Sequence, residues 1–201
     1  MKKVISISLL LFVFQWFFGQ SVSVEAKLAE LPGVTFQQIE TAEGYQACYE
    51  LYIEQAIDHN NPQRGTFTQK VYLSHRGFDR PMVMVTEGYA RARNSIYELS
   101  TLIKANQLDI EHRYFGDSSP NSADYQHLNL EQVTADLHHI NTLFKSLYTD
   151  KWLSTGISKG GQTTIYYRYF YPEDVDVSVP YVAPHNIEFE DKRIYAWLDT
   201  I

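Results

Sequence analysis

The stretch that decides the fold of this chain is Trp152-Leu153-Ser154-Thr155-Gly156-Ile157-Ser158-Lys159-Gly160-Gly161. It contains a short apolar run, the pattern Gly-x-Ser-x-Gly, and the start of a stretch that favours a helix to about Phe170. Glycines on both sides of a serine let a strand and a helix pass closely where the serine backbone is strained. Such a turn raises the serine hydroxyl above a sheet, so the pattern predicts Ser158 as a nucleophile.

Two other interpretations of this pattern have to be weighed. A phosphate-binding loop places Gly-Lys-Ser/Thr after four spacer residues, and Gly156-Ile157-Ser158-Lys159 lacks this order. A serine in an ordinary structural turn stays an alternative. The nucleophile is favoured because two strand–helix units precede the pattern, which is where an α/β-hydrolase places its nucleophile elbow.

Hydrophobic patterning from Ala47 onward predicts an antiparallel strand pair and then alternating strands and helices. The pair is expected at 47–57 and 66–74, joined by a turn-rich linker. Later strands are expected at 81–86, 108–112, 152–155 and 175–182, and helices at 95–106, from 130 onward and at 159–170. This alternation predicts the α/β class: an α/β-hydrolase fold with a mostly parallel sheet and helices on both faces.

Two of the expected helices have recognisable start signals. Ser95 and Glu98 have the spacing of a capping box at the start of the first helix. Asn129 is placed to cap the second helix, with Gln132 at the reciprocal position. Apolar residues then follow in steps of three and four, which indicates a helix with one buried face.

The first 45 residues differ from the rest. Lys2 and Lys3 precede an apolar run from Ile5 to Phe18, and Gly19 supplies a small residue at a plausible cleavage point. Residues 1–19 are therefore expected to be a signal peptide that directs export to the periplasm or the exterior, without stable membrane insertion after cleavage. An uncleaved anchor or a buried helix is the alternative. Residues 20–45 carry weak signals and are expected to form an N-terminal arm, before a catalytic domain over 46–201.

Composition excludes several kinds of partner. The net charge is −7 and no basic run is present, which argues against nucleic acid. Cys48 is the single cysteine, so no internal disulfide can form. The adjacent His138 and His139 face different directions on a helix, and no metal or cofactor is expected. The sequence leaves the oligomeric state open.

Acyl transfer at Ser158 requires an oxyanion hole. The backbone N–H of Lys159, directly after the nucleophile, is one expected donor. The second donor normally comes from the loop after an earlier strand, which points to the backbone N–H of Gly88 or Tyr89. The side chain of Lys159 is expected to be a solvated residue at the helix start.

The other members of a catalytic triad are expected to lie outside this chain. Serine hydrolases of this fold place an acid and then a histidine after the serine. His185 is the one histidine after Ser158, and it directly follows a strand, which is too early for the histidine position. The chain is therefore expected to be the N-terminal part of the catalytic domain, truncated before a cap and the last strands.

Several segments together resemble a known family. Glu111-His112-Arg113-Tyr114-Phe115-Gly116-Asp117-Ser118 is similar to the E-H-R-[YF]-[YF]-G-x-S segment of the prolyl carboxypeptidase group of serine exopeptidases. Thr86-Glu87-Gly88-Tyr89 and Tyr181-Val182-Ala183-Pro184 resemble the bacterial prolyl tri/tetrapeptidyl aminopeptidase family. The resemblance covers about 47–184. It implies an exported serine peptidase that acts on peptide substrates and releases short, proline-related peptides from free N-termini through an acyl-enzyme on Ser158.

Some functional questions stay open at this point. The Glu111-His112-Arg113 group is expected to form a buried ion-pair network. The alternative is that Glu111 or Glu87 binds the substrate ammonium. An esterase or lipase of the same fold is an alternative activity. A non-catalytic remnant is the alternative from a different class.

Overall fold

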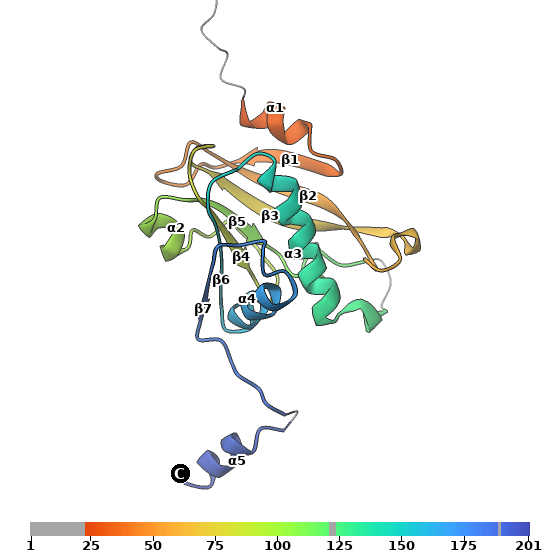
Figure 1. Cartoon of the computed structure of the whole chain (residues 1–201), viewed down its shortest axis with the longest axis vertical. Coiled ribbons are helices and arrows are strands. Elements are labelled where there is room, and N and C mark those ends of the chain that lie inside the picture. The colour runs from red at the N-terminus through yellow and green to blue at the C-terminus, as the bar shows by residue number, and fades with distance from the viewer. Residues whose placement is uncertain (1–22, 121–123, 189) are drawn as a thin grey trace, which may run out of the picture.

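In the part of the chain that the computed structural model describes (residues 23–120, 124–188 and 190–201), seven strands form one sheet in the order β1-β2-β3-β5-β4-β6-β7 (Figure 1). The strands are β1 (Val34–Ile39), β2 (Ala47–Ala56), β3 (Thr66–His75), β4 (Met82–Thr86), β5 (Asn106–Ile110), β6 (Trp152–Ile157) and β7 (Val177–Tyr181). The helices are α1 (Val24–Ala29), α2 (Glu98–Leu102), α3 (Leu130–Lys145), α4 (Lys159–Phe170) and α5 (Lys192–Leu198). Short 3-10 turns lie at Pro62–Arg64 and Tyr125–His127.

The sheet changes direction along its width, as predicted. Strands β1, β2 and β3 pair antiparallel, and β3 also pairs antiparallel with β5. Strands β5, β4, β6 and β7 are parallel to one another. Val85 of β4 is in register with Thr155 of β6, so the segments that follow these two strands leave the sheet side by side. Ser158 and the segment with Gly88 and Tyr89 therefore lie at the carboxyl ends of the parallel strands.

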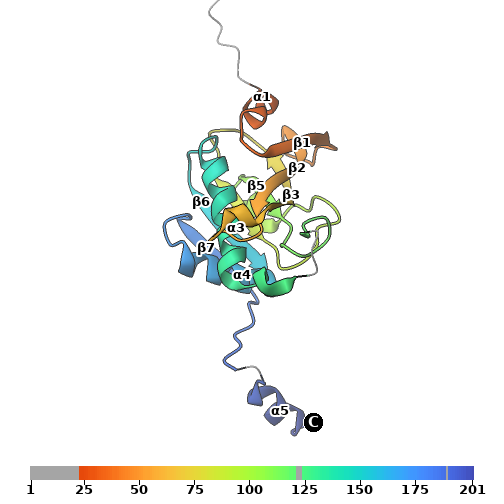
Figure 2. The same ribbon diagram turned by 90° about the vertical axis from the view of Figure 1, so that its right-hand side faces the viewer.

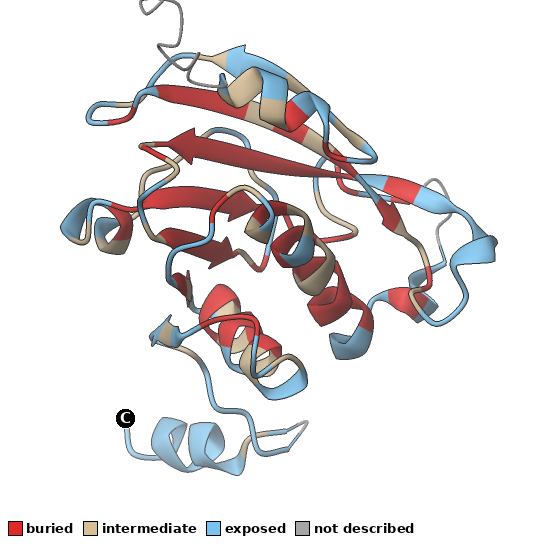
Figure 3. Cartoon of the chain, turned by 45° about the horizontal axis from the view of Figure 1, so that its top comes forward, coloured by how far each residue is buried: buried red, intermediate tan, exposed pale blue. Residues whose placement is uncertain are grey.

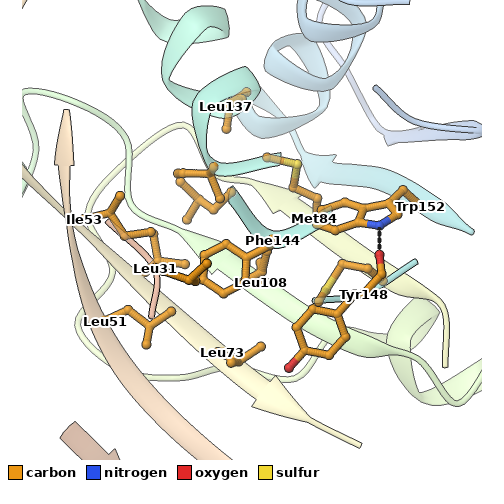
Figure 4. Close-up of a cluster of buried hydrophobic side chains, with 14 of the residues drawn as sticks. Leu31, Leu51, Ile53, Leu73, Met84, Leu108, Leu137, Phe144, Tyr148 and Trp152 are labelled. Atoms are coloured by element: carbon orange, nitrogen blue, oxygen red, sulfur yellow. Dashed lines mark hydrogen bonds between the residues drawn. The ribbon is translucent and has the colours of Figure 1, made fainter. Parts of the chain in front are cut away.

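Helices cover both faces of the sheet because side chains alternate along each strand. On β4, Met82 and Met84 belong to the larger core cluster, whereas Val83 and Val85 belong to the smaller one. The larger cluster packs under α1, α3 and α4, and Figure 4 draws part of it, including Met84, Phe144 and Trp152. The smaller cluster packs under α2. Burial is concentrated in the central strands and on the sheet-facing sides of α3 and α4 (Figure 3).

The start of α3 is confirmed and that of α2 is not. Asn129 Oδ1 accepts the Gln132 N–H at 3.0 Å, as a helix cap does. The capping box at Ser95 is wrong: α2 begins at Glu98, with Tyr97 as a cap residue that makes no side-chain cap bond. The buried side chain of Gln107 is the reason, because it binds the Tyr97 N–H (2.9 Å) and the Ser95 carbonyl (2.8 Å).

The segment before Ala47 is part of the sheet domain. Strand β1 pairs along its whole length with β2, and Leu28 and Leu31 are buried in the larger core cluster. The expected arm over 20–45 therefore contributes an edge strand and core residues where the structure describes it. The predicted signal peptide lies outside the described residues.

After β7 the chain leaves the sheet and ends in α5, which is set apart from the main body (Figure 2). The residues of α5 are exposed, including Trp197 at 59%. Across the described ranges, no helix combines the length and the hydrophobicity needed to cross a bilayer.

Candidate active site

Ser158 lies at the turn between β6 and α4. Its backbone adopts φ 56° and ψ −116°, a conformation that costs energy for a residue with a Cβ. The Ser158 N–H donates to the Tyr181 carbonyl (3.0 Å), and its own carbonyl accepts the Gln162 N–H (3.0 Å). The residue is exposed. A serine that is strained, held by its backbone and open to solvent has the geometry of a nucleophile elbow.

Close packing explains the glycines around Ser158. A Cβ on Gly156 would lie 2.9 Å from Gly160 Cα and closer still to the Gly160 carbonyl group. A Cβ on Gly160 would lie 2.8 Å from the Thr86 carbonyl oxygen, and one on Gly161 would lie 2.7 Å from the Tyr181 carbonyl oxygen. The start of α4 is therefore in contact with the carboxyl ends of β4 and β7, and side chains at these positions would push it away.

The two expected sources of the second oxyanion donor differ in their hydrogen bonding. The Gly88 N–H donates to Oε1 of Glu87 at 3.2 Å. The Tyr89 N–H has no acceptor among the described residues, and Tyr89 is half exposed. The Lys159 N–H is at the first position of α4, where helix donors lack intrahelical partners. The available donors are therefore those of Lys159 and Tyr89.

The side chain of Lys159 is half-buried and engaged within the protein, whereas the sequence predicts a solvated side chain. Its Nζ donates to the Gly88 carbonyl at 2.7 Å and lies 4.5 Å from the centre of the Phe115 ring and 5.0 Å from that of Tyr89. Burial lowers the pKa of this ammonium, and the nearby charge of Glu87 partly opposes the shift. The aliphatic part of the chain passes over Gly88, where a Cβ would lie 2.7 Å from Lys159 Cγ.

Glu111 braces the structure and does not face a substrate. Its side chain is fully buried, and Oε1 accepts from the Asp117 N–H (2.8 Å), the Ser118 N–H (3.0 Å) and the Ser118 hydroxyl (2.9 Å). Oε2 accepts the Arg91 N–H and lies 3.5 Å from Lys70 Nζ. Because both oxygens are occupied, the structure supports the expected buried network and leaves Glu111 no free oxygen for a substrate ammonium.

Glu87 is also engaged within the protein. Its Oε2 binds the Arg91 guanidinium and the Tyr97 hydroxyl, the latter at 2.9 Å. Arg91 Nε in turn binds Asp109 Oδ1 at 2.7 Å. Burial raises the pKa of Asp109 to about 7, although the Arg91 charge opposes the shift. This cluster fixes the loop that carries Gly88 and Tyr89 and leaves Glu87 only 11% exposed.

Arg113, the third residue of the Glu111-His112-Arg113 group, forms a buried ion pair with Asp136. Its guanidinium is fully buried and binds both carboxylate oxygens of Asp136, at 2.6 and 2.7 Å. It also donates to the backbone carbonyls of Ala56, Ile57 and His127. The side chain thereby ties α3 to the end of β2, so its role is structural.

The sequence placed His112 only in the Glu111-His112-Arg113 network and did not predict that it lines a cavity beside Lys159. Its Nδ1 lies 2.8 Å from the Arg113 carbonyl, so this nitrogen carries the proton. Burial lowers the pKa of His112 to about 4, and the ring is neutral at pH 7. It lines a mostly apolar cavity of about 80 Å³, together with Leu130, Val133, Lys159, Thr163 and Tyr166. Only the assembled helices reveal this cavity.

The acids and histidines after Ser158 do not assemble with it. Asp174 accepts from the Tyr167 hydroxyl (2.6 Å) and from His138 Nδ1 (2.8 Å), which joins α3 to α4. His185 is exposed in the segment after β7, where its carbonyl accepts from Arg193. Among the residues that the structure describes, no cluster of His, Cys, Asp and Glu has the arrangement of a metal site.

The mixed sheet, parallel from β5 to β7, and the strained serine at the β6–α4 turn define a hydrolase of the α/β class. Comparison with known proteins specifies the family. The model of the family described as PS-10 peptidase S37 matches residues 19–199, so the chain belongs to the peptidase S37 family. It is 36% identical over 173 residues to a prolyl tri/tetrapeptidyl aminopeptidase of Streptomyces mobaraensis, covering 86% of this chain and 36% of that protein. It is also 36% identical over 101 residues to the serine protease vicPb of Bipolaris victoriae, covering 42% of this chain and 19% of that protein.

Solved structures agree on the fold. Acetyl xylan esterase 1 from Thermoanaerobacterium sp. JW/SL YS485 superposes with a TM-score of 0.55 at 14% identity, covering 87% of this chain and 60% of the esterase. An identity this low shows the fold alone. The chain spans about a third of the length of its Streptomyces relative, with 36% covered.

Proposed function

We propose that the protein is a serine peptidase whose nucleophile is Ser158. The observation that carries this proposal is the exposed, strained Ser158 at the β6–α4 turn of a chain from a peptidase family. The hydroxyl oxygen attacks the scissile carbonyl carbon while its proton passes to a general base, in this reaction normally a histidine oriented by a carboxylate. The N–H groups of Lys159 and Tyr89 hold the oxyanion. The amine then leaves with a proton, and water releases the acyl group from Ser158.

We further propose that the substrates are peptides with free N-termini, from which short, proline-related peptides are released. The support is the identity to the Streptomyces prolyl tri/tetrapeptidyl aminopeptidase over 86% of this chain. The resemblance of the segments at 86–89, 111–118 and 181–184 to that family adds to it. The apolar cavity lined by His112 and Tyr166 is compatible with an apolar substrate group.

Labelling with a fluorophosphonate tests the nucleophile in the protein as its gene encodes it. The wild type should be labelled, and Ser158→Ala should not. Ser146→Ala, at the exposed end of α3, is the matched control and should label like the wild type. Equal labelling of wild type and Ser158→Ala would exclude Ser158 as the nucleophile.

A substrate panel tests specificity. Prolyl tripeptide and tetrapeptide nitroanilides should be cleaved, and N-acetylated versions should not be cleaved. Faster turnover of short acyl esters than of every peptide would establish the esterase alternative. Ser158-dependent cleavage of N-acetylated peptides would contradict the aminopeptidase assignment and retain the peptidase.

We also propose that the protein is exported. Lys2, Lys3 and the apolar run over 5–18 support this proposal. N-terminal analysis of protein recovered from the periplasm or medium should show cleavage near Gly19. Recovery of the protein only inside cells, with residues 1–19 still attached, would contradict it.

A further inference from the structure

We propose that the side chain of Lys159 is a positioning residue, which orients the oxyanion-binding N–H of Tyr89. This inference rests on the proposed function, because it concerns the same oxyanion hole. Lys159 would then serve the site twice, since its backbone N–H is one donor and its ammonium fixes the second.

The geometry that carries the proposal is one hydrogen bond across the site. Lys159 Nζ donates to the Gly88 carbonyl oxygen at 2.7 Å. The Gly88 carbonyl and the Tyr89 N–H belong to the same planar, trans peptide unit and point in opposite directions. A bond that fixes the direction of the carbonyl therefore also fixes the direction of the Tyr89 N–H.

Other bonds hold the same loop from different elements. The Tyr89 carbonyl accepts the His112 N–H at 3.1 Å, which ties it to the end of β5. The Arg91 N–H binds Glu111. The Lys159 bond differs because it comes from the residue next to Ser158. It links the second donor directly to the helix that carries the nucleophile, so the distance between them is set within one rigid unit.

The surroundings of the ammonium fit this role better than solvation or proton transfer. Rings of Phe115 and Tyr89 lie 4.5 and 5.0 Å from Nζ and stabilise a cation. A charged lysine has three donors and no acceptor, so it cannot take the serine proton. Gly88 is needed for the approach, because a Cβ there would lie 2.7 Å from Lys159 Cβ.

The experiment compares Lys159→Met, Lys159→Arg and Lys145→Met in the protein as its gene encodes it. Lys159→Met keeps the length of the side chain and removes the donor. Lys145→Met removes a half-buried lysine at the end of α3, whose Nζ donates to the Glu173 carbonyl away from the site. For Lys159→Met we expect kcat on a prolyl peptide nitroanilide to fall about 10- to 100-fold, below the full loss of a donor. KM should change less than about threefold, because the bond acts in the transition state. Lys159→Arg should recover part of kcat, and Lys145→Met should match the wild type.

Inhibitor binding separates positioning from a merely structural role. A boroproline peptide forms a tetrahedral adduct that uses the oxyanion hole, whereas the cleaved product peptide does not. Lys159→Met should weaken the affinity for the boroproline peptide by about the same factor as kcat, and should leave the affinity for the product peptide unchanged. Gly88→Ala should act like Lys159→Met, and the two together should cost no more than one alone, since they break the same contact.

The possible outcomes distinguish failure of the Lys159 inference from failure of the proposed function. If Ser158→Ala loses labelling while Lys159→Met keeps wild-type kcat and boroproline affinity, the Lys159 inference is wrong and the nucleophile stands. Equal loss of boroproline and product binding, with a lower melting temperature, would show a structural role and overturn the inference. Absence of any Ser158-dependent labelling in the wild type would overturn both proposals.

Discussion

The turn at Ser158 and the segment Glu111-His112-Arg113 both follow parallel strands at the same edge of the sheet, yet they are opposite in character. Ser158 is exposed, strained and surrounded by glycine contacts. Glu111 and Arg113 are fully buried and satisfied by backbone and ionic partners. Nucleophilic and ionisable residues at the carboxyl ends of strands are therefore not all catalytic. Exposure and backbone geometry distinguish the reactive group from the groups that hold it in place.

The largest effect should follow Ser158→Ala. We expect kcat to fall about 10⁶-fold, because removing the nucleophile leaves only binding and the oxyanion hole. The melting temperature should stay within about 2 °C, since Ala keeps the Cβ at the strained position. Steady-state kinetics and calorimetry check this pair of outcomes. A large stability loss would mean that Ser158 is also a structural residue.

Arg113→Met should show the reverse pattern. Removing Arg113 takes away the one guanidinium on the buried Asp136 and leaves His59 Nε2, at 2.7 Å, as its remaining side-chain partner, which should cost about 3–5 kcal/mol of unfolding free energy. Activity per folded molecule should stay near the wild-type value. Denaturant unfolding measures the loss, and Arg113→Met/Asp136→Leu should recover part of it. Lost kcat with unchanged stability would instead place Arg113 in the catalytic machinery.

His112→Asn tests the buried neutral imidazole through pH. The folded pKa of about 4 lies below the ordinary value of 6.5, so the unfolded chain binds a proton more readily in this window. The stability due to His112 is therefore complete above pH 6.5 and is lost as pH falls toward 4. The loss should reach about 3 kcal/mol relative to the variant, measured as unfolding free energy at several pH values. A wild-type-minus-variant difference that stays constant from pH 7 to 4 would contradict the neutral, buried state.

Glu111→Gln should give the smallest effect. The amide keeps one acceptor for the Ser118 and Asp117 N–H groups but loses the charge, which should cost about 2 kcal/mol of stability. The ratio of KM for free and N-acetylated peptides should not change, because Glu111 is buried. A selective rise of KM for peptides with a free amine would restore its role in binding the ammonium.

Local sequence was sufficient where the deciding contacts are close in the chain. The elbow is such a case, because the strained backbone is that of Ser158 itself and the glycines that make room for it, Gly156 and Gly160, lie two residues away on either side. The Asn129 cap is another, since the bond to Gln132 spans one helical turn. The predicted start of α2 was wrong because the side chain of Gln107, in the following strand, binds the Tyr97 N–H and the Ser95 carbonyl. The sequence near Ser95 does not reveal this distant partner.

The sequence by itself determined the α/β-hydrolase architecture and the position of Ser158, because periodicity and glycine spacing act over a few residues. The tertiary structure decided what the charged residues around it do. The sequence predicts a solvated Lys159, whereas Gly88 and Phe115 contact its ammonium in the fold. The sequence predicts a buried network at Glu111, but only the fold shows that its partners are Asp117 and Ser118. The reason is physical: burial and hydrogen bonding fix the role of an ionisable side chain, and both depend on residues far away in the chain.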